Sequence, residues 1–377
     1  MKKCVYEIMH GEQCVAQVDT QGHCEIYAVE FLPYQLYLDD SEEDIDTLVN
    51  NVTNFYYWCA ARVLTLDRQY AKEILNSIGA TQATTDKERA QIALSYHCLS
   101  LTDIYWVRLK GEQMTYQEVN LYENHLDNAF VDVSLRGRQM TVQNQSLVRD
   151  LSTDGCFPKA WVRTESGFRL LKDGGADAVE REVLASKICQ CFRCNQVVYE
   201  ETLFEGEKVS ASQIMTSRKY SIVSREALEI YAVNRDLDAQ RYILELDGYS
   251  YYMMNILDYL VGNTDRHWGN WGLLMDNETN RPISLHPLMD FNQAFQAYDR
   301  LEGANCQTVR PRLMSQKDAA VEAICKIGLN QVRDVDPAWF AGRSAEYEMF
   351  LQRLKVLQDR QSTSEKGSVI QYEKTVT

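Results

Sequence analysis

The stretch "VGNTDRHWGN", residues 261–270, places an Asp, an Arg, a His and two Asn within eight positions. It follows the apolar run "YYMMNILDYL" (251–260), which predicts a buried helix. Polar side chains at the end of such a helix are typical of a helix cap followed by a surface loop. They are also typical of a catalytic loop anchored on buried structure. The residues that follow favour the catalytic loop.

The chain after this stretch predicts a β-hairpin. "NWGLLMDNETNRPISLHPLMDF" (270–291) contains a strand, a turn at residues 276–281 and a return strand. The hairpin would bring Asp290 back beside the loop that holds Asp265 and Asn270. Two carboxylates and an amide oxygen are ligands that Mg²⁺ prefers, with water and phosphate oxygens completing its octahedron. One carboxylate would remain free to orient or deprotonate an attacking hydroxyl.

Two lysines upstream supply the positive charge that phosphate groups require. "STDGCFPKAWVRTESGFRLLKDGG" (152–175) predicts two strands joined by a tight turn at residues 165–167. Lys172 ends the second strand, and Lys159 lies in the turn after Gly155. Glu182, on the predicted helix "ADAVEREVLASKICQCF" (176–192), could pair with Lys172. Each residue alone is typical of a solvated surface charge, but their order ahead of the acidic loop predicts a nucleotide site.

These motifs resemble a known family. "GNTDRHWGN" (262–270) followed by "LMDFNQAF" (288–295) looks like the catalytic and metal-binding loops of HipA-like kinases. The order "DGCFPKAW…FRLLK…EREVLASKI" resembles the nucleotide-binding lobe of the same family. The Asp-Arg-His-x-x-Asn string is also similar to the catalytic loop of phosphatidylinositol 3/4-kinases. The resemblance covers about residues 150–330. The phosphate loop is poorer in glycine than the family pattern, and the first 140 residues differ from the amino-terminal subdomain expected of HipA.

The resemblance implies an α+β, two-lobed protein-kinase-like fold, with a small β-rich lobe and a larger helical lobe behind an N-terminal β and helical region. It implies ATP and Mg²⁺ as cofactors. Together with the residue pattern, it gives the following roles: Asp265 as catalytic residue, His267 as a structural or substrate-orienting residue of the catalytic loop, Asn270 and Asp290 as Mg²⁺ ligands, and Gly155, Lys159, Lys172 and Glu182 in nucleotide binding.

We divide the chain into an N-terminal region (1–145), a nucleotide-binding small lobe (146–225), a helical catalytic lobe (226–361) and a loose polar tail (362–377). Residues 1–38 predict short strands. Residues 39–43 predict the start of a helix, with Ser41 as its N-cap. That helix carries an apolar stripe: Ile45, Leu48, Val49, Val52, Phe55 and Tyr56. A second long helix is predicted over residues 84–109, opened by a capping box of Thr85 and Glu88.

Composition narrows the possible functions. The chain has 377 residues, with 39 Lys+Arg against 54 Asp+Glu and a net charge of -15, so direct nucleic-acid binding is not expected. No apolar run approaches the roughly 20 residues that span a bilayer, and the start lacks the apolar core of a signal peptide. We therefore expect a cytoplasmic protein whose 11 cysteines are free thiols. "CQCFRC" (189–194) lacks a second CxxC pair, so small helix residues are favoured over zinc ligands.

Three functions remain open. The first is an ATP- and Mg²⁺-dependent kinase that phosphorylates a hydroxyl, Ser or Thr of a protein, with an antitoxin-like or regulatory protein as a further partner. The second is a small-molecule or phosphoinositide-type lipid kinase. The third is a pseudokinase that serves as a binding module. Hydroxyls in two segments are candidates for autophosphorylation or for simple turn hydrogen bonds: Ser210, Ser212, Thr216, Ser217, Tyr298 and Thr308.

Overall fold

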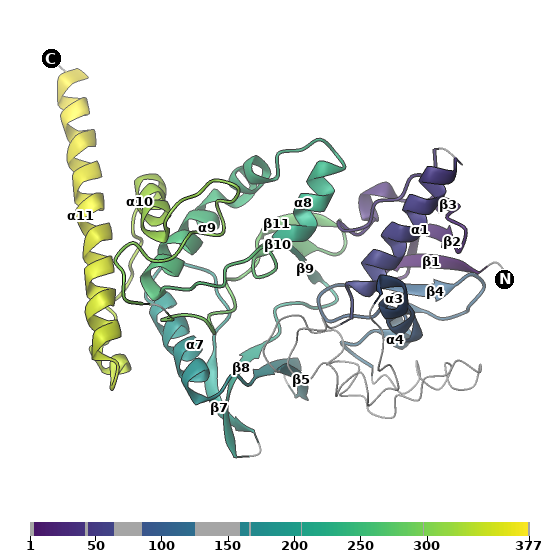
Figure 1. The fold of residues 1–377 in the computed structure, drawn as a ribbon, viewed down its shortest axis with the longest axis horizontal. Coiled ribbons are helices and arrows are strands. Elements are labelled where there is room, and N and C mark those ends of the chain that lie inside the picture. The colour runs from purple at the N-terminus through teal and green to yellow at the C-terminus, as the bar shows by residue number, and fades with distance from the viewer. Residues whose placement is uncertain are drawn as a thin grey trace.

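The computed structural model describes residues 4–41, 44–63, 85–124, 159–165, 167–204, 206–296 and 298–375, with side chains as far as residue 363. In this part of the chain the strands form three antiparallel sheets (Figure 1). The N-terminal sheet and its helices lie at one end of the molecule, and helix α11 lies at the other. The mixed, segregated arrangement is the predicted α+β class.

The N-terminal sheet has the strand order β3-β2-β1-β4. Its strands are β1 (Val5–His10), β2 (Gln13–Asp19), β3 (Cys24–Ile26) and β4 (Tyr105–Leu109). Helices α1 (Ile45–Ala60) and α3 (Asp86–Ser95) pack against each other and help to bury Trp58 and Trp106 in one apolar core. Two single turns, η1 (Val29–Phe31) and α4 (Tyr116–Val119), complete the region. The short strands predicted near the N-terminus are confirmed.

Helix α1 begins later than the sequence predicts. Its N-cap is Asp44, whose carboxylate accepts hydrogen bonds from the backbone N–H groups of Asp46 and Thr47. Ser41 instead donates its hydroxyl to Asp39 at 2.6 Å. The apolar stripe is only partly buried, because Phe55 is 2% exposed whereas Ile45 is 76% exposed and Val49 is 58% exposed. The prediction of Ser41 as the cap is therefore wrong.

The second helix is much shorter than the sequence predicts. The capping box of Thr85 and Glu88 is present, but α3 ends at Ser95. His97 and Cys98 then adopt positive φ angles of 59° and 55°, which no helix tolerates. The segment "YWVRL" (105–109) becomes β4 and pairs with β1. Aromatic and β-branched residues fit a half-buried sheet well, so sheet pairing determines the structure of this apolar run.

The small lobe is a four-stranded sheet of order β5-β6-β8-β7. Strands β5 (Lys159–Thr164) and β6 (Gly167–Lys172) form the predicted hairpin, and α7 (Ala176–Cys189) and β7 (Glu200–Phe204) follow in the predicted order. Strand β8 (Glu207–Gln213) lies between β6 and β7 and is not predicted from the sequence. Phe168 of β6 is buried in the N-terminal core, so the two regions share apolar packing.

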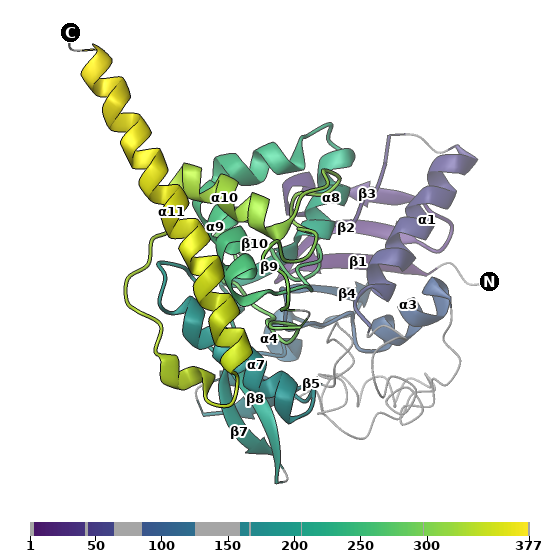
Figure 2. The same cartoon turned by 60° about the vertical axis from the view of Figure 1, so that its left-hand side comes forward.

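The catalytic lobe is built around α9 (Ala239–Val261), which contacts α10 (Gln316–Ile327) and α11 (Ser344–Thr375). Figure 2 shows α11 lying across α10 and α9. A third sheet joins β9 (Tyr220–Ser224) to the predicted hairpin of β10 (Gly272–Asp276) and β11 (Arg281–Leu285). Helix α8 (Arg225–Val233) and the turn η2 (Pro337–Phe340) complete this lobe.

Helix α11 continues to Thr375, although a loose tail is predicted from residue 362. The segment is polar but contains Gln, Glu and Lys, which favour helix, and it lacks proline. Its backbone is therefore helical rather than irregular. No helix in the described residues is both long and apolar enough to cross a membrane.

Candidate active site

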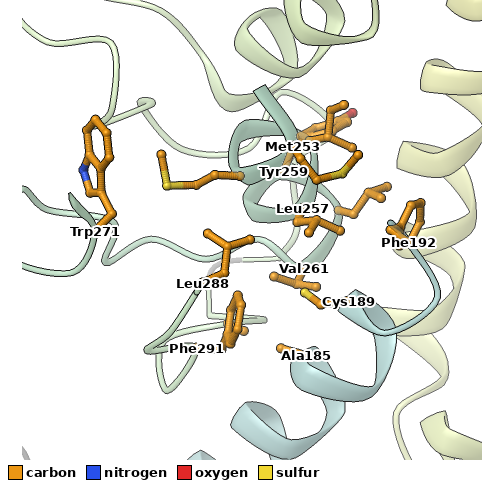
Figure 3. Packing of buried hydrophobic residues seen from close by; sticks show 14 of the residues in the cluster. Ala185, Cys189, Phe192, Met253, Leu257, Tyr259, Val261, Trp271, Leu288 and Phe291 are labelled. Atoms are coloured by element: carbon orange, nitrogen blue, oxygen red, sulfur yellow. The ribbon is translucent and has the colours of Figure 1, made fainter. Parts of the chain in front are cut away.

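The candidate catalytic loop, residues 262–270, follows directly on the buried end of helix α9. Helix α9 ends at Val261, and Gly262 takes a left-handed conformation with φ 62°. A Cβ at Gly262 would lie 2.4 Å from the ring of Tyr298, so only glycine fits there. Figure 3 shows Leu257 and Val261 of α9 packed near Cys189 of α7, in one cluster of buried apolar side chains. The loop that follows is therefore attached to a buried part of the main apolar core.

A buried arginine fixes the loop internally. The guanidinium of Arg266 makes two hydrogen bonds to the carboxylate of Asp258, at 2.9 and 3.0 Å. Its remaining nitrogen donates to the carbonyls of Asn270 at 2.9 Å and Met289 at 2.5 Å. Arg266 thereby joins the two ends of the catalytic loop to the residue that precedes Asp290. No role is expected of Arg266 from the sequence, although a charged residue after a buried helix is a signal of such a clamp.

Asn270 is oriented by the loop itself. Its amide nitrogen donates to the backbone carbonyl of Asp265 at 2.8 Å, and its backbone N–H donates to the carbonyl of His267. The amide nitrogen is therefore occupied, and the side-chain oxygen is the atom that can bind a cation. Asn270 is 8% exposed, so this oxygen has little freedom to move.

Asp265 and His267 differ in their surroundings. Burial raises the pKa of Asp265 above its ordinary value, and the nearby charge of Asp290 raises it further, while His267 and Arg266 oppose these effects. His267 is exposed, and its Nδ1 accepts the backbone N–H of Gly269 at 3.0 Å. Asp265 therefore has the environment of a carboxylate that can exchange a proton, while the contact made by His267 shapes the loop.

Lys172, at the end of β6, and Glu182, on α7, form the predicted pair. Lys172 Nζ lies 2.8 Å from Glu182 Oε1 and 3.0 Å from Asp290 Oδ1. The second oxygen of Glu182 accepts the hydroxyl of Ser210 at 2.5 Å. The side chains of Lys172, Glu182 and Asp290 are 7%, 1% and 14% exposed, so the network is largely removed from water. Its charges are consequently strongly coupled.

Asp290 holds a negative charge in this network. Burial alone would raise its pKa, but the charges of Lys172 and Lys159 outweigh that effect and bring the pKa to about 2. The backbone of Asp290 is left-handed, with φ 61°. Asp tolerates this conformation better than most residues, yet it is uncommon and concentrates at functional sites. The carboxylate is therefore ionised at neutral pH, as a metal ligand must be.

The structure brings together most of the residues that the sequence singles out. Lys172 contacts both Glu182 and Asp290, and Lys159 is close enough to act on the charge of Asp290. Arg266 connects them to the loop that carries the other candidates. Gly155 lies outside the described residues. Lys159, predicted in the turn after Gly155, is instead the first residue of β5 and pairs with Lys172 across the hairpin. The metal and catalytic roles of these residues remain predictions.

The candidate autophosphorylation sites do not form accessible loops. All but one of these hydroxyl-bearing residues are buried: Ser210, Ser212, Thr216, Tyr298 and Thr308. Ser210 donates to Glu182, and Thr308 donates to Asn255 at 2.5 Å. Ser217 accepts the backbone N–H groups of Lys219 and Tyr220. These contacts favour the alternative, in which the hydroxyls hydrogen-bond neighbouring groups.

The cysteine-rich segment is not a helix throughout. Helix α7 ends at Cys189, and Cys191 and Cys194 lie beyond it. Burial raises the pKa of all three thiols, which disfavours the thiolate form that binds metals. Among the described residues, no group of three or more His, Cys, Asp or Glu side chains could hold a metal ion. Cys189 and Cys191 lie in the main apolar core, and Cys194 packs against it.

Solved structures resemble this chain at low sequence identity. HipA of Shewanella oneidensis MR-1, solved in a toxin–antitoxin complex with HipB and its operator DNA, is 10% identical, with a TM-score of 0.51 over 95% of both chains. The Helicobacter pylori proinflammatory kinase CtkA is 12% identical, with a TM-score of 0.43 over 56% of this chain and 95% of that chain. No family model matches the sequence, and no curated protein is significantly similar to it.

The chain has a HipA-like kinase fold, as its motifs predict. The likeness to HipA spans 95% of this chain, so it is not confined to residues 150–330. At 10% identity the likeness is one of fold alone, so the expected departure of the N-terminal 140 residues from the HipA sequence pattern stays a prediction.

Proposed function

We propose that this chain is a kinase that uses ATP and Mg²⁺ to transfer the γ-phosphoryl group to a hydroxyl, Ser or Thr of a protein. One observation carries the proposal: Lys172 is paired with both Glu182 and Asp290 beside a catalytic loop fixed by Arg266. Phosphoryl transfer depends mainly on positioning and on charge stabilisation, and a rigid buried set of charges provides both.

The side chains fit a Mg·ATP complex. Asp290 is ionised and the oxygen of Asn270 is free of the hydrogen bond that holds its nitrogen, so these two would be the metal ligands. Mg²⁺ at nucleotide sites commonly uses one or two protein ligands and completes its shell with water and phosphate oxygens. When bound, Mg²⁺ would neutralise charge on the phosphates. Lys172 would bind the phosphates, and Lys159 would add positive charge beside them.

Asp265 would act on the acceptor. Its pKa is raised by burial, so the carboxylate can accept a proton from a hydroxyl more readily than an exposed Asp can. The backbone carbonyl of Asp265 is held by Asn270, which fixes the spacing between the proposed base and the proposed metal ligand. His267 would help to orient the acceptor from the exposed side of the loop.

ATP turnover measured for the wild type and for Asp265→Asn tests the proposal. We expect the variant to lose at least about 100-fold in activity, the usual effect of removing a general base. Asp359→Asn, which changes an exposed carboxylate on α11, should retain wild-type turnover. A wild type that binds Mg·ATP without turnover would instead establish a pseudokinase.

The acceptor class requires its own measurement. Mass spectrometry and phosphoamino-acid analysis after incubation with Mg·ATP should find phosphoserine or phosphothreonine on an added protein substrate. Turnover that depends on a small molecule or a lipid, with no phosphoprotein, would assign the alternative kinase class.

A protein partner also belongs to this proposal. The solved HipA chain is bound to HipB and operator DNA, and on this ground we propose an antitoxin-like or regulatory protein that binds this chain. The net charge of -15 disfavours direct contact with nucleic acid. Light scattering of the natively purified protein should give a mass above the 43.5 kDa of the single chain, and identification of a second polypeptide is required.

A further inference from the structure

Tyr199 lies where the small lobe meets the metal-binding segment. Residues 195–199 run beside the chain that leads into Asp290. The backbone N–H of Val197 donates to the carbonyl of Leu288 at 2.8 Å, and the N–H of Leu288 donates to the carbonyl of Asn195 at 2.9 Å. Residues 196 and 288 form a parallel bridge. This pairing fixes the position of Tyr199 relative to Asp290.

The hydroxyl of Tyr199 accepts the backbone N–H of Asp290 at 3.0 Å. The same oxygen lies 3.5 Å from Lys172 Nζ, and the ammonium group lies 4.8 Å from the centre of the Tyr199 ring. The Tyr199 ring also makes an edge-to-face contact with Phe291, at 6.4 Å between ring centres, so it contacts the residue after Asp290 as well. One side chain thus touches Asp290, its neighbour and the lysine that pairs with it.

Tyr199 is itself held in place. Its backbone N–H donates to the hydroxyl of Ser186 at 3.1 Å, and Ser186 belongs to α7, the helix that carries Glu182. Tyr199 is 4% exposed, so its ring cannot swing into solvent. Burial, together with the charges of Glu182 and Asp290, raises its pKa to about 12, although Lys172 opposes them. The phenol is therefore neutral at neutral pH.

The hydroxyl matters because Asp290 is left-handed, with φ 61°. Such a conformation persists only when surrounding contacts define it. Without the phenolic oxygen, the buried N–H of Asp290 would lose its acceptor, and a buried donor without a partner is unfavourable. The backbone could then relax towards an ordinary φ angle, which would turn the carboxylate away from Lys172. Packing by the ring alone does not supply this acceptor.

We propose that Tyr199 is a positioning residue that holds the Asp290 backbone and thereby sets the direction in which its carboxylate meets the metal ion. This inference rests on the proposed kinase function, in which Asp290 is a Mg²⁺ ligand. It adds a link between the lobes, because α7 orients Tyr199 and Tyr199 orients Asp290. A shift of α7 would then act on the metal ligand through Tyr199 as well as through the Lys172–Glu182 pair.

Tyr199→Phe removes the hydroxyl and keeps the ring, so it separates positioning from packing. A matched control is Tyr96→Phe, because Tyr96 is 1% exposed and its hydroxyl donates to the carbonyl of Arg62 at 2.8 Å in the N-terminal core. Calorimetry should measure the binding of a non-hydrolysable ATP analogue to wild type and to both variants, with and without Mg²⁺. Amide hydrogen exchange at Asp290 should be followed by NMR in the same proteins.

We expect Tyr199→Phe to lose about 10- to 100-fold of the Mg²⁺-dependent gain in affinity, the usual effect of changing a residue that orients a metal ligand. Metal-free affinity should stay close to that of the wild type. Exchange at the Asp290 amide should accelerate in Tyr199→Phe and remain slow in Tyr96→Phe. The exchange measurement requires no nucleotide, so it reports on the hydroxyl contact directly.

Three different outcomes would contradict different parts of the inference. Wild-type Mg²⁺ dependence in Tyr199→Phe would overturn the positioning role, whether or not exchange accelerates. A wild type that binds the analogue equally with and without Mg²⁺ would overturn the proposed kinase function and, with it, the role of Tyr199. Equal losses of Mg²⁺ dependence in Tyr199→Phe and Tyr96→Phe would reduce the effect to general destabilisation.

Discussion

Lys172 shares one ammonium group between two buried carboxylates. Burial by itself lowers the pKa of Lys172, but Asp290 and Glu182 more than compensate and raise it well above its ordinary value. The lysine is therefore charged, and each carboxylate depends on it. Buried ion pairs contribute little net stability compared with apolar residues, but removal of one partner leaves an uncompensated charge. This asymmetry determines what substitution at Lys172 does.

The first prediction separates charge from geometry at Lys172. Lys172→Met should abolish ATP turnover and lower the stability of the fold by about 3–5 kcal/mol, because two carboxylates lose their partner. Lys172→Arg should retain most of the stability yet remain inactive, since a planar guanidinium cannot reproduce a point charge. Removal of Glu182 should do intermediate damage. Urea unfolding and ATPase assays on each variant provide the measurements. Lys159→Met should lower ATP turnover and the free energy of unfolding much less than Lys172→Met does.

The second prediction uses the opposite pKa shifts of Asp290 and Asp265. The folded-state pKa of Asp290 is about 2, below its ordinary 3.8, so folding favours the ionised form. This stabilisation is present above pH 3.8 and is lost as the pH falls through about 2. Asp290→Asn should therefore destabilise the protein at pH 7 by on the order of 2 kcal/mol and have less effect at the acid end.

Asp265 should respond with the opposite sign. Its pKa is raised, first by burial, so folding favours the protonated form, and that stabilisation is lost as the pH rises through the folded-state pKa. Asp265→Asn should therefore increase the melting temperature at pH 7 while it abolishes activity, a trade-off typical of active sites. Thermal unfolding of both variants at several pH values checks the pair. If Asp290→Asn and Asp265→Asn change the melting temperature at pH 7 in the same direction, the environments assigned to the two carboxylates are contradicted.

At the scale of elements, local signals predict the structure well where no distant contact competes. The capping box at Thr85, the hairpin of β5 and β6 and the hairpin of β10 and β11 all occur where the sequence predicts them. Their signals are turn residues and caps that act within a few positions. The nucleotide-binding roles of the candidate residues stay predictions; the charged side chains at the ends of apolar segments are the local signal on which they depend.

Distant contacts explain what the sequence could not predict. The run "YWVRL" fits a helix or a strand, and only its pairing with β1, about 100 residues earlier, settles the choice. Tyr199 has no local signal at all, since its importance arises from Asp290, 91 residues later. The sequence predicts Lys172 as a nucleotide-binding residue, but its direct contact with Asp290 spans 118 residues and follows no sequence pattern. Single-sequence patterns report local conformation, and these contacts depend on the tertiary fold.

The third prediction concerns the loop between α9 and β10, which carries Arg266. Arg266 and Asp258 are 2% and 7% exposed, so their ion pair is buried. Arg266→Leu should destabilise the protein by about 3–5 kcal/mol, because Asp258 loses its partner and the carbonyls of Asn270 and Met289 lose a donor. Arg241→Leu is the control, since Arg241 is 75% exposed in its pair with Glu245 and such pairs contribute at most about 1 kcal/mol.

At the scale of the whole molecule, the N-terminal region contacts both kinase lobes. Tyr105 of β4 donates its hydroxyl to Asn280, in the turn between β10 and β11, and Asn280 donates to the carbonyl of Glu30 at 2.8 Å. Tyr34 stacks on Tyr231 of α8, with 4.1 Å between ring centres. These contacts reach the hairpin that separates the catalytic loop from Asp290. The N-terminal region is therefore positioned to limit how far the two lobes move apart.

One arginine makes several of the polar contacts between the N-terminal region and the small lobe. Arg163 of β5 donates to the carbonyls of Leu121 at 2.9 Å, Tyr122 at 3.1 Å and Asn124 at 3.1 Å. Its guanidinium also lies 4.6 Å from the ring centre of Phe168, which belongs to the N-terminal core. Hydrogen bonds from a charged donor are stronger than neutral ones, and three of them converge here. Arg163 thus fastens the small lobe to the N-terminal region.

The fourth prediction tests whether the molecule unfolds as one unit. The wild type should show a single thermal transition, because the N-terminal core contains Phe168 of the small lobe. Arg163→Ala should lower the free energy of unfolding by roughly 3 kcal/mol and broaden or split the transition. Arg169→Ala is the matched control on the neighbouring strand, because Arg169 pairs with Glu200, which is 69% exposed. If Arg163→Ala keeps one sharp transition at the wild-type temperature, the N-terminal region does not restrain the lobes through this contact.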